Sequence, residues 1–341
     1  MEKLTIVVRI ALCLLAMMTT ACSTTDEHDS EAAPIVFSGV GVTDTRASSD
    51  YISSSSFVYH SRIGVFCYYT GSSPWSTSSA SALPNFMYDQ AVERQYEGAW
   101  TYQPVKYWPN QTDDKLTFYG YYPHDGVGIT LKGSNATAGL PAFTFNVQER
   151  SQDQVDFMLS DVDADEMHIS SVPSQTSVSY QVALRFHHAL SRIVLRVVDE
   201  ATNGQLDFTA TLSGWYDQGD CQTGGSGSIG WSSCSENGTV FTTDGAVNAN
   251  QRILLMIPGN LRGEGLDPVL KFRYIYQGVP LESAEFHLNR TGASTPGDTS
   301  DDLTEWEPGK TYTYTYHVSI TGNFLSVAVN PWYQAGMVFE N

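Results

Sequence analysis

Tyrosine and threonine alternate over residues 311–316, and this run constrains the fold more than any other feature of the sequence. Successive side chains of a β-strand point to opposite faces, so the tyrosines and Val318 should share one face and the threonines the other. Elsewhere helical periodicity is scarce, while short alternating runs are common, as in all-β proteins. The sequence therefore predicts an all-β fold.

Further alternating runs end at turn residues such as proline and glycine. They lie at residues 34–42, 63–69, 115–122, 143–147, 177–186, 192–198, 252–257, 270–276 and 324–329. A polar, acidic stretch without periodicity interrupts the series between residues 161 and 175. Roughly 300 residues after a leader suggest about two domains. We therefore expect two β-sandwich domains, at residues 34–165 and 176–341.

The first 22 residues carry the signal of an exported lipoprotein. Two basic residues precede an apolar run at residues 10–18, which is shorter than the roughly 20 residues needed to cross a bilayer. Ala21 followed by Cys22 is the arrangement in which the thiol is acylated and the cysteine becomes the new N-terminus. An ordinary secretory signal is the alternative, but the polar stretch that follows suits a lipid tether. We expect a signal peptide at residues 1–21, lipidation at Cys22, for example by palmitate, and an acidic tether at residues 22–33.

Charge and motifs exclude several classes of function. The formal charge is −19, from 18 basic and 37 acidic residues, which repels nucleic acids and anionic lipid headgroups. We expect no nucleic-acid partner and membrane contact only through the lipid anchor. The sequence contains no G-x-S-x-G, HExxH, CxxC or Gly-rich phosphate loop, so we expect no enzyme, catalytic residue or cofactor.

Two short segments, one acidic and one with two histidines, could suggest a metal site. The acidic run at residues 161–166 lacks the glycine and the distal glutamate of a calcium loop, so a solvated linker is the better interpretation. His187 and His188 are adjacent on a predicted strand and should point to opposite faces, which disfavours chelation. We expect no metal site.

The remaining cysteines and aromatic residues allow more than one interpretation. Cys221 and Cys234 flank a Gly/Ser-rich stretch, where a disulfide across a hairpin tip and two free thiols are comparably reasonable. Cys67 lies in an apolar run and is predicted to be a small core residue. Three side chains of the aromatic stretch from Tyr96 to Tyr122 could stack against a sugar, or could belong to the core. They are Trp100, Tyr107 and Trp108.

Six blocks of sequence, in this order, resemble the fimbrillin family of Bacteroides-type bacteria, which contains the Mfa-like and FimA-like subunits of surface fimbriae. The blocks lie at residues 102–109, 116–123, 156–159, 182–197, 308–316 and 327–332. They extend over nearly all of the chain after the leader. The resemblance implies two β-sandwich domains of transthyretin-like topology.

The resemblance also implies assembly by strand donation. A protease would cut after Arg46, before Ala47, and the first strand would leave so that a strand of a neighbouring subunit fills its groove. The released strand would carry the apolar residues Ile35, Phe37, Val40 and Val42. The alternative is that Arg46 is a lone arginine in a polar linker.

The resemblance also sets expectations for location and partners. The precursor would be an outer-membrane lipoprotein and the mature chain a part of a fimbria at the cell surface. Its partners would be other fimbrial subunits and a host or bacterial surface ligand. The sequence leaves open a stalk, tip or anchor position, and whether residues 333–341 form a donor strand or an edge strand. A second hypothesis is a monomeric glycan-binding surface lipoprotein of a polysaccharide-uptake system.

Overall fold

The computed structural model divides the chain into two units, Met1–Ala33 and Pro34–Asn341, and the second is described below. The residues described are 33–38, 40–43, 52–53, 57–111, 113–167, 181–224, 228–243, 251–290 and 302–332. The leader, Cys22, Arg46, Ala47 and the segment after Trp332 lie outside these residues. The lipidation and cleavage sites therefore stay predictions.

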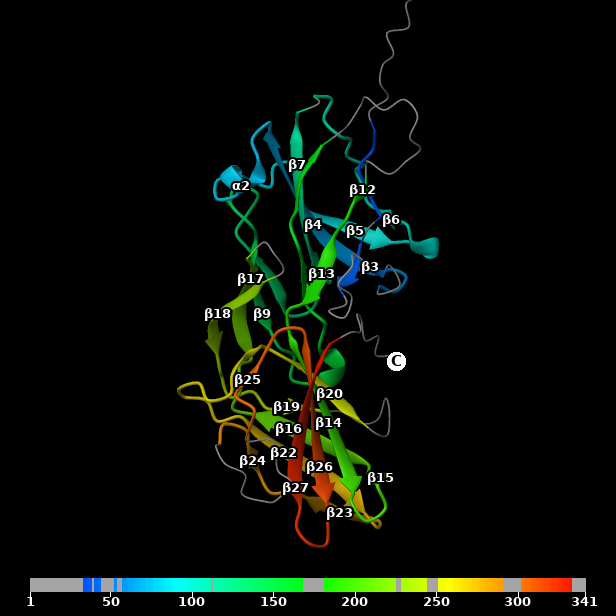
Figure 1. Ribbon diagram of the computed structural model, residues 1–341, viewed down its shortest axis with the longest axis vertical. Coiled ribbons are helices and arrows are strands. Elements are labelled where there is room, and N and C mark those ends of the chain that lie inside the picture. The colour runs from blue at the N-terminus through cyan, green and yellow to red at the C-terminus, as the bar shows by residue number, and fades with distance from the viewer. Residues whose placement is uncertain are drawn as a thin grey trace, which may run out of the picture. The chain divides into compact units, whose positions relative to one another are not determined.

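The predicted all-β class is confirmed (Figure 1). Within the described residues, the helical elements are α2 (Trp75–Ser78) and the 3-10 turns η2 (Tyr96–Gly98) and η3 (Ser151–Asp153). No helix in this part of the chain is long and apolar enough to cross a membrane. The transthyretin-like topology stays a prediction.

The largest sheet has nine strands. Its order is β3 (Ile52–Ser53), β2 (Gly41–Thr43), β13 (Arg185–His188), β10 (Met158–Ser160), β7 (Lys115–Tyr122), β4 (Arg62–Gly71), β5 (Met87–Arg94) and β6 (Trp100–Thr101), with β11 (Asp163–Met167) also paired to β7. A two-stranded sheet joins β1 (Val36–Phe37) to β12 (Gln181–Val182). The middle residues of β4 and β7 are buried at successive positions, as in strands covered on both faces.

The acidic run was wrongly predicted to be a solvated linker. Residues Asp163–Met167 form β11, which pairs with β7 across a β-bulge. This strand is short and rich in carboxylates, so its sequence lacks the apolar alternation that indicates a strand. The strand was not predicted because its pairing depends on β7, which is distant in the sequence.

A four-stranded sheet contains strands from both sides of the predicted domain boundary. Its order is β18 (Ile229–Ser235), β17 (Gln218–Thr223), β9 (Ala142–Asn146) and β8 (Ile129–Lys132). The β9–β17 ladder places Phe143 opposite Cys221. The predicted domain limits stay a prediction, and these pairings show that strands of the two halves share sheets.

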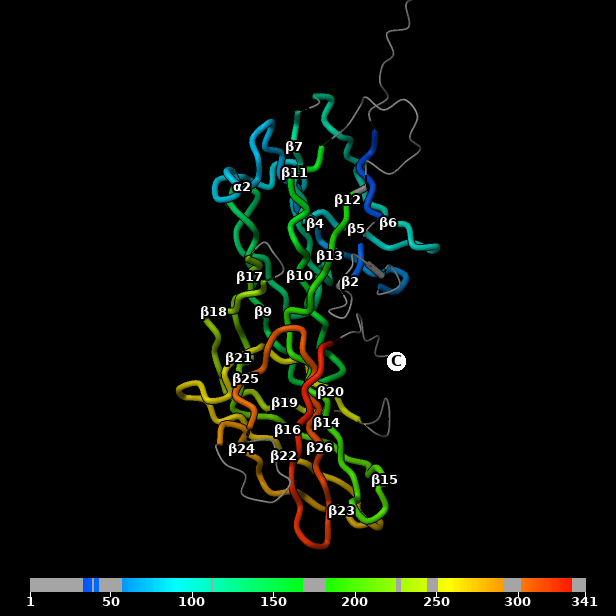
Figure 2. Tube along the Cα trace, in the orientation of Figure 1, coloured from blue at the N-terminus to red at the C-terminus, as the bar shows by residue number. Residues whose placement is uncertain are grey.

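The remaining strands form two facing sheets and a small third one (Figure 2). The first contains β15 (Gly204–Gln205), β14 (Ser191–Asp199), β26 (Lys310–Val318) and β27 (Phe324–Pro331), with β20 (Arg252–Met256) beside β14. The second contains β19 (Phe241–Thr242), β16 (Phe208–Ser213), β22 (Val269–Tyr276) and β23 (Val279–Glu282), with β24 (Phe286–His287) beside β22. The third pairs β21 (Gly259–Asn260) with β25 (Glu305–Trp306).

The tyrosine face of β26 fills the space between the two facing sheets. Tyr312, Tyr314 and Tyr316 are at most 1% exposed, as the alternation predicts. The Tyr316 ring stacks on Phe272 of β22 with centroids 5.3 Å apart. This aromatic layer belongs to a core that continues to residues of the nine-stranded sheet.

Candidate functional site

Residues 34–38 and 40–43, which contain β1 (Val36–Phe37) and β2 (Gly41–Thr43) and are called the first strand below, bury apolar side chains in the interior. The four predicted side chains Ile35, Phe37, Val40 and Val42 are 2%, 1%, 0% and 6% exposed. Val36, between the first two, is 43% exposed. The first strand therefore contributes four side chains to the interior, although it is only loosely alternating in sequence.

The backbone of the first strand has neighbours on both sides. Residues 181–188, which contain β12 and β13 and are called the acceptor strand below, run parallel to it. On its other side, the Ile35 N–H donates to the Lys106 carbonyl at 2.9 Å, and β2 pairs antiparallel with β3. Figure 1 shows the blue first strand beside the green acceptor strand. Because the first strand is internal, its removal would leave backbone groups unpaired on both sides.

The pairing between the first strand and the acceptor strand changes register once. Phe37 pairs with Val182, and Val42 pairs with Phe186. The first strand thus uses five residue steps where the acceptor strand uses four. An extra residue in one strand of a ladder is a β-bulge, which redirects the side chains that follow it.

Aromatic side chains form the floor under Phe37. Its ring meets Tyr102 edge-on at 5.6 Å and Phe118 at 6.0 Å, and Trp108 packs against Phe118. The Tyr102 hydroxyl donates to the Ile35 carbonyl at 3.0 Å. Burial raises the pKa of Tyr102, so the hydroxyl stays protonated and remains a donor. The sequence did not indicate any of these contacts.

The suggested sugar-stacking platform is corrected by burial. Trp100 and Trp108 are 6% and 4% exposed, and their rings pack against Phe57 and Phe118. A sugar needs an open aromatic face, which neither indole offers. Of the three, only Tyr107 is exposed, at 51%, and one ring does not form a platform.

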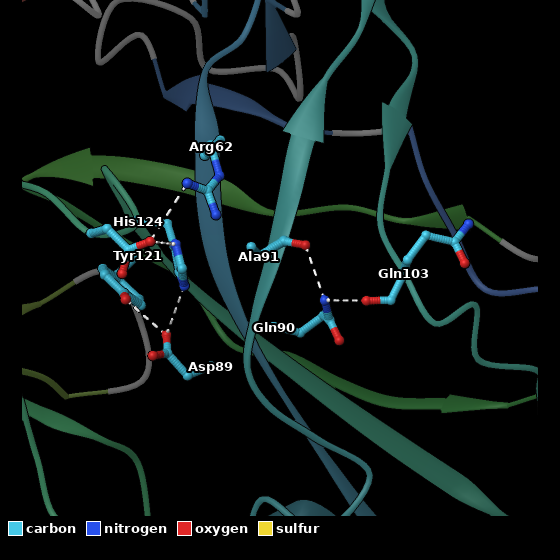
Figure 3. A network of polar contacts seen from close by, with 8 residues as sticks. Arg62, Asp89, Gln90, Ala91, Gln103, Tyr121 and His124 are labelled. Atoms are coloured by element: carbon cyan, nitrogen blue, oxygen red, sulfur yellow. Dashed lines mark hydrogen bonds and ion pairs between the residues drawn. The ribbon is translucent and has the colours of Figure 1, made fainter.

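Figure 3 shows how β5 is fixed beside this region. Asp89 interrupts the β4–β5 register with φ of 47°, and its carboxylate accepts from the Tyr121 hydroxyl at 2.7 Å. His124 Nε2 lies 3.5 Å from the same oxygen, and Gln90 donates to the Gln103 carbonyl at 3.2 Å. The latter bond ties β5 to the segment that carries Tyr102.

This polar network does not have the properties of a catalytic site. Burial and the nearby Asp89 raise the pKa of Tyr121, so the phenol serves as a donor and not as a base or nucleophile. His124 Nδ1 lies 2.8 Å from Asp125, which also pairs with Arg62 at 3.5 Å. Within the described residues, no three histidine, cysteine or carboxylate side chains are grouped to hold a metal. We assign the network to positioning β5.

Two carboxylates of β11 are Asp163, which contacts the acceptor strand, and Glu166 beside it. Asp163 accepts from the Ala183 N–H at 3.0 Å, at the join between β12 and β13. Burial, and then the neighbouring Asp163, raise the pKa of Glu166 to about 7. Burial raises the pKa of Asp163 as well. The acidic run thus secures the acceptor strand, which the sequence did not indicate.

The two adjacent histidines pair with different carboxylates. His187 Nε2 lies 3.0 Å from Asp161, whereas the buried His188 Nδ1 lies 2.9 Å from Asp156. The His188 ring also stacks on Trp332, with centroids 3.8 Å apart. The imidazoles therefore act in separate packing environments.

The disulfide between Cys221 and Cys234 is not formed. Both thiols are free, and the β17–β18 ladder places Cys221 opposite Trp231 instead of opposite Cys234. Cys67 is buried, as predicted for a core residue. Burial also raises the pKa of Cys221, which keeps this thiol protonated.

Comparisons with known proteins match this chain to fimbrial proteins. A family model described as fimbrillin-like matches residues 45–332. The fimbrium subunit Fim1C of Phocaeicola vulgatus is 32% identical over 141 residues, which cover 38% of this chain. The chain spans 35% of the length of that curated relative.

Solved structures share the fold. A fimbrial protein from Bacteroides vulgatus superposes with a TM-score of 0.58 at 19% identity, over 88% of this chain and 99% of the other. A structure from Bacteroides uniformis, described as a candidate cell adhesion protein, gives a TM-score of 0.58 at 13% identity, over 89% and 99%. At these identities the likeness is one of fold.

Proposed function

Since the chain belongs to the fimbrillin-like family, we propose that it is a subunit of a cell-surface fimbria and joins other subunits by exchange of its first strand. The internal position of the first strand carries this proposal. Four buried apolar side chains and backbone bonds on both sides hold residues that precede Arg46 in the sequence. A cut after Arg46 would separate the first strand from the rest of the chain.

Physical chemistry supports exchange as the outcome of that cut. An emptied groove would expose backbone donors and acceptors together with apolar pockets, and a strand from another molecule satisfies both at once. The fimbrial names of the Phocaeicola relative and the Bacteroides structure agree with assembly into a surface polymer. The family relationship favours a structural role over an enzymatic one.

Limited proteolysis tests the proposal. A chain beginning at residue 22 with Cys22→Ser should be clipped by trypsin after Arg46 and then form multimers that resist SDS without heating. Arg46→Lys keeps the trypsin site and should behave alike, whereas Arg46→Ala should stay monomeric. Complete cleavage that leaves only monomers would contradict assembly by strand exchange.

We also place the precursor at the outer membrane through a lipid on Cys22. The small residue before Cys22 and the polar tether after it support this anchor. Labelling of cells with a palmitate analogue should mark the chain, and Cys22→Ser should abolish the label. A label that persists in this variant would refute acylation at Cys22.

A further inference from the structure

Two exposed tyrosines lie together at the loop of the β5–β6 hairpin, on the edge of the nine-stranded sheet (Figure 1). Tyr96, in the turn η2 between the two strands, is 78% exposed, and Tyr59, in the segment before β4, is 49% exposed. Their rings meet edge-on, with centroids 6.2 Å apart and planes at 88°. The neighbouring Val58 is exposed as well. An exposed apolar cluster, unlike a single exposed ring, is a common mark of a binding surface.

The backbone around the two tyrosines is fixed. The His60 N–H donates to the Arg94 carbonyl at 3.0 Å, and the Gln95 N–H donates to the Ala99 carbonyl at 2.6 Å. His60 and Glu97, each next to one of the tyrosines, have φ of 67° and 68°, which is unfavourable for residues other than glycine. Such strain persists where the surrounding structure enforces it, and it is concentrated at ligand sites. The two rings are therefore held at the surface by a rigid support.

A buried aromatic contact joins the two segments from inside. Phe57, two residues before Tyr59, meets the Trp100 ring edge-on with centroids 5.5 Å apart. Trp100 begins β6 directly after the hairpin loop that carries Tyr96. Both inner rings are buried, whereas the two outer rings are open to solvent. Their packing keeps the distance between the outer rings constant.

Charged groups of both signs border the two tyrosines. His60 Nδ1 lies 2.6 Å from the Glu93 carboxylate, and this bond lowers the pKa of Glu93, which is therefore ionised. Arg62 lies opposite Glu93 in the β4–β5 ladder and also pairs with Asp125. Glu97 adds an exposed carboxylate in the hairpin loop. The carboxylates disfavour an acidic ligand, and the imidazole and guanidinium disfavour a cationic one, so the charges suit a neutral ligand with hydroxyl groups.

We propose that Tyr59, Tyr96, His60 and Glu93, called the tyrosine cluster below, form a binding site for the neutral sugar rings of a glycan. The apolar C–H face of a sugar ring can stack on an aromatic ring, while its hydroxyls donate to the carboxylate and accept from the imidazole. The site is separate from strand exchange, because its residues belong to neither the first strand nor the acceptor strand. Trp100 supports this site from beneath and does not touch the sugar.

Sugar binding by the uncut chain tests the site. The chain from residue 22, with Cys22→Ser and Arg46→Ala, is titrated with the methyl glycosides of galactose, glucose, mannose and fucose, and with those of glucuronic and sialic acid. Saturation-transfer NMR detects weak binding and gives an apparent Kd for each sugar. At least one neutral glycoside should bind, and the two acidic glycosides should bind at least about tenfold more weakly than it does.

Substitutions locate the bound sugar on the chain. Tyr96→Ala and Tyr59→Ala should each weaken binding of the neutral glycoside at least about tenfold, because a stacked ring is lost. Tyr96→Phe keeps the ring and should stay within about threefold of the parent chain. Tyr107→Ala removes an exposed ring outside the tyrosine cluster and should leave binding unchanged. Equal urea midpoints would show that these surface variants keep the fold.

Several results would overturn the proposal. If no neutral glycoside binds, or if binding survives both alanine substitutions in the tyrosine cluster, the site is wrong. If the acidic glycosides bind more tightly, the ligand class is wrong. If the chain instead self-associates and Tyr96→Ala abolishes this, the tyrosine cluster is a contact between copies. Each result leaves the proposed strand exchange standing, because the chain tested keeps its first strand.

Discussion

The first strand and β26 occupy the same kind of position, since each lies inside a sheet with a parallel neighbour on one side. β14 pairs with β26 without interruption from Arg192–Thr311 to Asp199–Val318, and β27 pairs along its other edge. The first strand pairs with its parallel neighbour in two short runs separated by a bulge. Under the proposed strand exchange, continuity of the ladder would distinguish the permanent strand from the exchanged one.

The side chains of the two strands also differ in the kind of contact that they make. The hydroxyls of Tyr312, Tyr314 and Tyr316 each accept a hydrogen bond from a specific donor, at 2.7, 3.1 and 2.8 Å. The first strand buries aliphatic and phenyl groups, whose contacts have no such direction. A strand of another sequence can reproduce non-directional contacts if its spacing is right, whereas it could not reproduce the tyrosine bonds.

The largest effect is expected on the permanent strand. Tyr314→Ala removes a fully buried ring and should lower the free energy of unfolding by about 3–5 kcal/mol, measured by urea denaturation. Tyr314→Phe, the matched control, loses only the bond from the Trp306 indole and should cost about 1 kcal/mol. A loss below about 1 kcal/mol for Tyr314→Ala would remove β26 from the permanent core.

The second prediction concerns the anchor of the first strand. Phe37→Ala should speed amide exchange of residues 35–42 by about a hundredfold, because the aromatic floor loses its central contact. Exchange of residues 311–318 should change by less than about tenfold. Val36→Ala, at an exposed position, is the control and should change neither. Equal acceleration in both strands would show that they open together.

The third prediction uses Glu166, the carboxylate of β11 beside Asp163. The pKa of Glu166 rises from 4.5 to about 7 on folding, so the folded chain retains a proton that the unfolded chain releases between these values. Stability contributed by the protonated form is therefore lost as pH rises through this window. Glu166→Gln mimics the protonated form and should stabilise the chain at pH 8 by about 1–2 kcal/mol, allowing for solvent screening.

The same substitution should have little effect at pH 5, where Glu166 is already protonated. Urea denaturation at both pH values measures this difference, with the exposed Glu264→Gln as the control. A gain that is equal at both pH values would mean that the carboxylate pair does not govern it.

The smallest effect is expected from a single hydroxyl. Tyr102→Phe leaves the Ile35 carbonyl without its donor and should weaken docking of the first strand by about 0.5–1.5 kcal/mol. Amide exchange of residues 35–42 reports this loss, and Tyr107→Phe at an exposed ring is the control. If both variants exchange like the parent chain, the hydroxyl does not secure the first strand.

The sequence allowed the buried face to be predicted for β26 but not for the first strand. Residues 311–318 alternate so strongly that the buried face followed directly. Residues 35–42 carry apolar groups in both phases, so local pattern cannot decide which phase is buried. The partner of these residues is the acceptor strand, some 145 residues away in sequence, and no local preference encodes such a partner.

The walls of the groove escaped prediction for a related reason. Asp163 and Glu166 look like solvated charges in sequence, but β7 and the acceptor strand give them backbone partners and burial. The hydroxyl of Tyr102 looked like one more aromatic group of a crowded stretch. Side chains that act on a distant backbone become visible only when the pairing of strands is known.

The short hairpin of β2 and β3 has a consequence for the order of events. Val42 pairs with Ser53 and Thr43 with Ile52, while Arg46 lies between the two strands in sequence. Before a cut, this covalent link keeps the first strand at an effective concentration of about millimolar beside its groove. After a cut, the same contacts would become bimolecular, and dilution would favour departure. Cleavage would then act by changing the molecularity of docking, without altering any contact in the groove.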